Sequence, residues 1–118
     1  EESDEPEQGA GINEVLYGLM SESDKLGELS RLLGRLRFAI EGSDRETVDE
    51  VGEEIVVLAR HLPGEFQVAN LLTVAKDTSE RSSQLAKLYL DRCFRLSAGD
   101  ANEARVLDEQ IQELREQE

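Results

Sequence analysis

Residues 24–41 have the sequence DKLGELSRLLGRLRFAIE, and this stretch decides the fold of the chain. An aliphatic residue recurs in it every three or four positions, at Leu26, Leu29, Leu32, Leu33, Leu36 and Ile40. That spacing is typical of an amphipathic helix with one buried face, and it leaves Arg31 and Arg35 on the opposite side. Gly42 is expected to end the helix, because glycine adopts the left-handed conformation at little cost.

Helical spacing continues on both sides of this stretch. Further helices are expected in residues 11–21, after Ser43, at about residues 65–77, and on either side of the Ala98-Gly99 break. In the first of them, the residues expected to face the core are Ile12, Val15, Leu16, Leu19 and Met20. No stretch alternates with the period of two that marks a strand. We therefore predict an all-α fold of about six helices arranged as antiparallel pairs.

Side-chain oxygens mark where these helices should begin. Ser23 is predicted to cap the helix of residues 24–41, since its hydroxyl can accept a hydrogen bond from a free amide of the first turn. Ser43, Asp77 and Asp100 are each followed three residues later by glutamate, which is the spacing of a capping box.

The charge of the chain limits its partners. Its 118 residues carry a formal net charge of −14, and the first eight, EESDEPEQ, include five acids and no base. Residues 1–9 are therefore expected to form a disordered acidic tail or linker, and residues 10–118 a single helical domain. Nucleic acid would be repelled, whereas a basic protein or peptide is favoured. No segment has the apolar length for membrane insertion, so a soluble domain is expected, with the cytoplasm as the favoured compartment.

Catalytic and metal-binding patterns are missing from the sequence. His61 is the only histidine and Cys93 the only cysteine, so neither a zinc site nor an internal disulfide can be assembled. His61 is expected to cap the end of a helix, and Cys93 to be a small residue of the core. Phosphate-binding glycine loops and calcium loops are also absent. We therefore expect a non-enzymatic protein without a cofactor or a metal.

An internal repeat is visible at an offset of 35 residues. RHLPGEFQVANLL at residues 60–72 aligns with RLSAGDANEARVL at residues 95–107, so that Gly64 matches Gly99 and Asn70 matches Arg105. Each copy contains a helix end, a break and an acidic cap. A helix-turn-helix unit of this length resembles the tetratricopeptide repeat family over residues 24–118. An unrelated helical bundle is the alternative.

The resemblance implies a short right-handed superhelix that acts as a protein–protein interaction module within a larger protein. In that family, the first helix of each pair lines a concave groove for a partner peptide or helix. Carried over to this chain, the groove residues would be Arg31, Arg35, Asn70 and Arg105. The alternative function is a dimerisation or structural bundle in which residues 11–41 pair with a second copy. The apolar residues expected to mediate that self-association are Leu16, Tyr17 and Met20.

Overall fold

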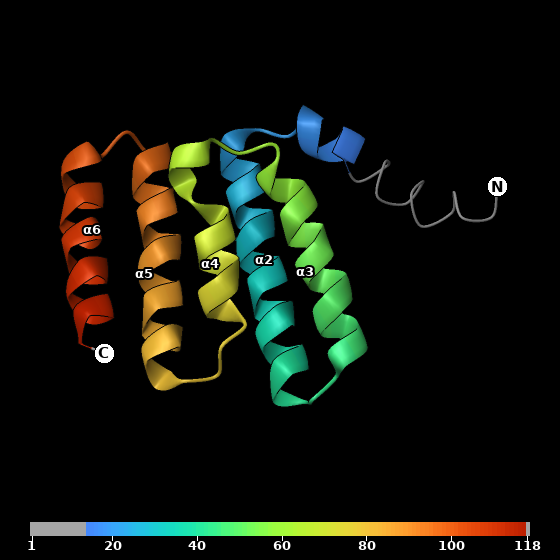
Figure 1. Cartoon of the computed structure of the whole chain (residues 1–118). Helices are drawn as coiled ribbons and strands as arrows, with labels where there is room; N and C mark the ends of the chain where they lie inside the picture. The colour runs from blue at the N-terminus through green and yellow to red at the C-terminus, as the bar shows by residue number, and fades with distance from the viewer. Residues whose placement is uncertain (1–13, 118) are drawn as a thin grey trace.

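The computed structural model describes residues 14–117, which form a layered array of helices (Figure 1). A short helical segment at residues 14–19 comes first. The elements that follow are α2 (Glu22–Glu41), α3 (Arg45–Ala59), the 3-10 turn η1 (Gly64–Phe66), α4 (Val68–Ala75), α5 (Glu80–Ser97) and α6 (Ala101–Glu116). Residues 14–117 contain no strand, which confirms the prediction of an all-α chain with about six helices. The predicted acidic tail lies outside the described residues.

Consecutive helices run in opposite directions and pack against one another (Figure 1). α2 lies at the centre of the packing, since it contacts α3, α4 and α5. α6 packs along α5 at one edge of the array. Its buried face consists of Ala104, Leu107 and Ile111, and most of its remaining residues are exposed. α6 therefore presents a mainly polar face at this edge.

The core is built around the leucine stripe of α2. Leu26, Leu29, Leu32 and Leu36 have no solvent-accessible surface. The buried cluster that surrounds them includes Val51, Ile55 and Leu58 from α3, Leu71 from α4, and Leu85 and Cys93 from α5. Each buried leucine contributes about 2 kcal/mol relative to an exposed one. Because short isolated helices are marginal in water, this shared burial is what stabilises the individual helices.

The start of α2 differs from the prediction. Ser21, not Ser23, is the N-cap, and its hydroxyl accepts a hydrogen bond from the Asp24 amide at 3.0 Å. The earlier start lets the Lys25 amide bond the Ser21 carbonyl at 2.9 Å. It also brings Glu22 and Asp24 into the first turn, where the helix dipole favours acidic residues. The prediction that Ser23 caps this helix is therefore wrong by two residues.

The junction between α2 and α3 is also shifted by one residue. Ser43, at φ 57°, takes the left-handed conformation expected of Gly42, whose φ is −88°. Its amide bonds the Ile40 carbonyl at 3.0 Å, and the next amide bonds the Ala39 carbonyl at 2.9 Å, so this turn satisfies the end of α2. With Ser43 used in this way, Asp44 becomes the N-cap of α3 and bonds the Thr47 amide at 3.2 Å.

Of the helix caps predicted at Asp77 and Asp100, only the second is present. Asp100 caps α6 as predicted, because its carboxylate accepts from the Glu103 amide at 3.2 Å. Asp77 does not cap α5. Its carboxylate instead accepts from the Ser79 amide at 3.1 Å, and the Ser79 hydroxyl caps the helix by accepting from the Ser82 amide. The side chain of Asp77 closes the preceding turn, so the cap passes to the serine two residues later.

α4 is shorter than the helix predicted at residues 65–77. Gly64–Phe66 forms a 3-10 turn, and Gln67 then adopts the left-handed conformation at φ 56° before α4 begins at Val68. The side chain of Phe66 is buried in the core, which holds the turn against the other helices. An α-helix cannot pass through Gln67 in that conformation, so its start is delayed.

The first helical segment packs in a different way from the predicted stripe. Tyr17 is buried in the core with 6% of its surface exposed, while Val15, Leu16 and Leu19 remain exposed. The Tyr17 ring meets His61 edge-on, with ring centroids 6.2 Å apart. The helical segment of residues 14–19 is too short to bury a full apolar stripe. The large aromatic ring of Tyr17 therefore provides its main contact with the core. Of the residues predicted for self-association, Leu16 is exposed, Met20 is partly buried and Tyr17 is buried in the core. Ile12, predicted to face the core, lies outside the described residues.

In residues 14–117, no helix combines the length and the apolar character that a bilayer crossing requires.

Replacing Ser43 by glycine should stabilise the fold, because glycine adopts the positive φ of this position without steric cost. We expect Ser43→Gly to raise the free energy of unfolding by about 0.5–1 kcal/mol. The matched control is Ser30→Gly, an exposed position inside α2, where the same substitution should lower it by about 0.5 kcal/mol. Urea unfolding of both variants measures these changes. Destabilisation by Ser43→Gly would contradict the conformation described at this junction.

Candidate binding groove between α4, α5 and α6

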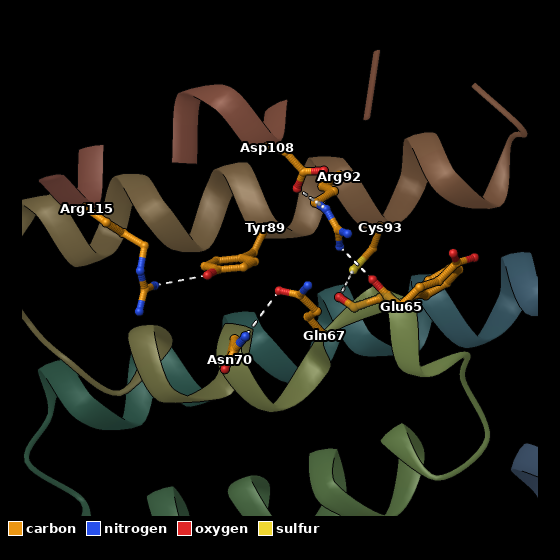
Figure 2. Close-up of polar contacts among 9 residues, drawn as sticks. Glu65, Gln67, Asn70, Tyr89, Arg92, Cys93, Asp108 and Arg115 are labelled. Atoms are coloured by element: carbon orange, nitrogen blue, oxygen red, sulfur yellow. Dashed lines mark hydrogen bonds and ion pairs between the residues drawn. The ribbon is translucent and has the colours of Figure 1, made fainter. Parts of the chain in front are cut away.

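A polar pocket with a volume of about 400 Å³ opens between the start of α4, the middle of α5 and the second half of α6. Its lining consists of Gln67, Asn70, Tyr89, Arg92, Asp108, Ile111, Gln112 and Arg115. We refer to it as the polar groove. Figure 2 shows most of the polar side chains of this region and the contacts that hold them. The volume is in the range of natural ligand sites.

Arg92 forms the floor of the polar groove, and only 7% of its surface is exposed. Its Nε donates to Asp108 Oδ1 at 2.5 Å, and its Nη1 donates to the carbonyl oxygen of Glu65 at 2.7 Å (Figure 2). One guanidinium therefore joins α5 to α6 and to the 3-10 turn before α4. A buried cation is tolerated when its charge is paired and hydrogen-bonded, and here Asp108 supplies the charge and Glu65 a second acceptor.

Cys93 holds the same 3-10 turn through a second contact. Its Sγ lies 3.3 Å from the Phe66 carbonyl, to which it donates a weak hydrogen bond (Figure 2). Burial raises the pKa of the Cys93 thiol to about 11, so the thiolate is disfavoured at neutral pH. The prediction that Cys93 is a core residue is confirmed. Adjacent residues of α5 thus fix two successive carbonyls of the segment that leads into α4.

Tyr89 and Arg115 form the part of the polar groove that can bind an added ligand. Tyr89 has a buried ring, and its hydroxyl oxygen accepts a hydrogen bond from Arg115 Nη1 at 3.0 Å (Figure 2). Since the oxygen accepts, the hydroxyl proton of Tyr89 is available to a further acceptor. Among the described residues, Arg115 makes no ion pair, and its guanidinium has further N–H groups beyond the one used.

Asn70 lies across the polar groove from these donors. Its Nδ2 donates to Gln67 Oε1 at 3.1 Å, which orients the amide (Figure 2). Its oxygen and its second N–H have no hydrogen-bond partner within residues 14–117. Asp108, the one carboxylate in the lining, is already bonded to Arg92. The lining therefore offers several donors and an amide acceptor, and it contains no cysteine, serine or histidine that could act as a nucleophile or base. This arrangement is suited to holding a polar ligand.

The structure does not bring the four predicted groove residues together. Only Asn70 lines the polar groove. Arg105 is on the exposed surface of α6, where it bonds Asn102 at 3.1 Å. Arg31 and Arg35 are exposed on α2, where they approach Glu28 and Glu54 respectively. The predicted set is thus divided among three places.

The residues that accompany Asn70 were missed, although the sequence contains a signal for one of them. Arg92 occupies a helical position in line with Leu85 and Tyr89, so a charged residue interrupts an otherwise apolar stripe. A charge on a buried stripe requires a partner of opposite charge. In the structure this partner is Asp108 on α6. Arg115 has no comparable signal, because its place beside Tyr89 depends on how α6 packs on α5.

His61 has a different role from the predicted helix cap. Its Nε2 lies 3.3 Å from Glu14 Oε2, and its ring packs against Tyr17, so it contacts the first helical segment. Its carbonyl oxygen accepts from Lys25 Nζ at 2.7 Å. Within the described part of the chain, no group of three or more acidic, histidine or cysteine side chains could hold a metal ion.

Removing Arg92 should destabilise the junction that leads into α4. We expect Arg92→Ala to lower the free energy of unfolding by about 2–3 kcal/mol, since the Glu65 carbonyl and Asp108 both lose a charged donor. Hydrogen exchange of the Phe66 and Gln67 amides, which bond within the turn, should accelerate. The matched control Arg95→Ala removes only an exposed contact with Asp91 and should cost less than about 0.5 kcal/mol. Equal losses in the two variants would show that Arg92 has no special structural role.

Comparison of the chain with protein-family models, with curated proteins and with solved structures finds no match, so the resemblance to tetratricopeptide repeats stays a prediction.

Proposed function

We propose that this chain is a non-catalytic protein-interaction module that holds an extended segment of a partner protein in the polar groove. The observation that carries the proposal is the Tyr89–Arg115 pair, a buried hydroxyl and an arginine that makes no ion pair with any residue of 14–117, both of which line one pocket. Every peptide segment supplies backbone carbonyls that such donors can bind. The stacking of helix pairs as a short superhelix, as in the tetratricopeptide repeats, belongs to the same proposal.

The chemistry of the partner follows from the surroundings of the polar groove. The exposed residues of α6 include Glu109, Glu113 and Glu116, and the whole chain carries a net charge of −14. Long-range attraction therefore favours a basic segment. Within the groove, Tyr89 and Arg115 would bind carbonyl oxygens of that segment, while its lysine or arginine side chains would lie along the acidic surface of α6.

Selection from a displayed library of random peptides tests this proposal. We expect the intact chain to enrich peptides rich in lysine and arginine, with binding that weakens as salt is added. Tyr89→Phe combined with Arg115→Ala removes the donors but keeps the buried ring, and should weaken the selected peptides about tenfold, equivalent to about 1.4 kcal/mol. Fluorescence anisotropy with labelled peptides measures the change.

Arg105→Ala is the matched control, because it removes an arginine of α6 that lies outside the polar groove. Its affinity for the same peptides should stay within about twofold of the parent chain. Failure to enrich any peptide would contradict the proposal. So would equal loss of affinity in the double variant and in Arg105→Ala.

A further inference from the structure

The outward face of α2 exposes groups that an isolated helix does not favour. Phe38 lies on this face with 80% of its surface exposed. Gly27 and Gly34 lie on the same face, and a Cβ added to either would meet no atom within 4 Å. The packing of this chain therefore does not require glycine at these positions, although glycine weakens a helix relative to alanine. A face with small residues at its centre allows another backbone to approach closely.

Further exposed apolar residues lie just before α2 in the chain and near its C-terminal end. Just before α2, Leu19 is 80% exposed and Val15 is 64% exposed. At the other end, a hollow of about 390 Å³ lies beside Phe38, and its lining also includes Gly34, Arg35, Ala39, Asp44 and Thr47. The exposure of Phe38 beside this hollow indicates a contact with another protein surface.

The charges along one flank of α2 have a definite order. Asp24 and Glu28 come first and Arg31 and Arg35 follow, all within one sector of the helix by their spacing. The helix dipole accounts for acids or bases only in the first and last turns; in the middle, Glu28 and Arg31 form an i,i+3 pair in which the side chains are 23% and 56% exposed. In the single chain Arg31 bonds Glu28 and lowers the pKa of that carboxyl group. Arg35 only approaches Glu54, at 3.8 Å.

This order identifies the occupant of the face. In a two-fold symmetric pair of antiparallel helices, a given flank meets the same flank of the other copy in the reverse direction. The acidic half of one α2 then faces the basic half of the other. We propose that a second copy of this chain docks on the outward face of α2, with the two α2 helices antiparallel.

One register satisfies both charge pairs. When Asp24 of one copy lies opposite Arg35 of the other, Glu28 of the first lies opposite Arg31 of the second, because the two pairs are spaced equally about the same midpoint. The midpoint falls between Leu29 and Ser30, and Gly27 and Gly34 lie on either side of it. The same register brings Phe38 opposite Ser21, the N-cap of α2 in the other copy. Phe38 and the charged flank therefore lie in the same proposed interface.

The proposed dimer leaves the polar groove free. The groove is lined by residues of α5, α6 and the first part of α4, with none from α2. Dimerisation and peptide binding can therefore be tested separately, and the failure of one would not affect the other.

Sedimentation velocity over a range of protein concentrations is the first test. We expect the parent chain to form a dimer and Phe38→Glu to weaken the association at least about tenfold. The matched control is Val106→Glu, which places the same charge at an exposed apolar residue of α6 and should leave the dimer unchanged. A parent chain that stays monomeric at all concentrations would overturn the proposal, as would equal effects of the two variants.

Charge reversal tests the antiparallel register. Arg31→Glu with Arg35→Glu makes the flank entirely acidic, and Asp24→Arg with Glu28→Arg makes it entirely basic. Each double variant should be monomeric alone, and an equimolar mixture should form a heterodimer with an affinity close to that of the parent. Circular dichroism of each variant checks that the helices persist. Variants that fold but do not associate in the mixture would exclude this register and with it the proposed mode of docking.

Discussion

The complete burial of four leucines of α2, Leu26, Leu29, Leu32 and Leu36, is the constraint on which the rest of the structure depends. α2 is in contact with α3, α4 and α5, and its four core leucines have no exposed surface. The other helices complete their own apolar faces against this stripe or against each other. α4 is an example: it has only eight residues, too few for a stable helix in isolation, and it persists because Leu71 and its neighbours are buried.

Polar contacts add positional precision to this apolar packing. The chain turns between α3 and α4, where the Pro63 and Gly64 carbonyls accept hydrogen bonds from backbone amides of the turn. Arg92 and Cys93 supply donors to Glu65 and Phe66, so two neighbours on α5 determine where α4 begins. Because Arg92 also binds Asp108, the position of α6 depends on the same guanidinium. Arg92 thus connects α5 with α6 and with the 3-10 turn that leads into α4, next to the polar groove.

The helical class and the buried stripes could be predicted from the sequence, since the spacing of leucines is a local property. Helix starts were predicted less well. Ser43 and Gln67 adopt left-handed conformations that residues other than glycine normally avoid. Hydrogen bonds and core contacts that form only in the folded chain stabilise these conformations. The repeat predicted that Asn70 and Arg105, its equivalent at the 35-residue offset, both line a groove. In the structure Asn70 lines the polar groove, whereas Arg105 lies outside it. The reason is that the two copies of the repeat differ in their environment, because α4 is covered by neighbours while α6 lies at an edge.

The buried thiol of Cys93 has a practical consequence. It is the only cysteine in the chain, it is hydrogen-bonded to the Phe66 carbonyl, and its pKa is about 11. A thiol-specific alkylating reagent reacts with the exposed thiolate, so the folded molecule is protected and an opened one is labelled. The chain thereby carries an internal reporter of its own opening at the position where α5 meets the turn before α4. Mass spectrometry could count opened molecules in a mixture, even within a cell extract, without any engineered label.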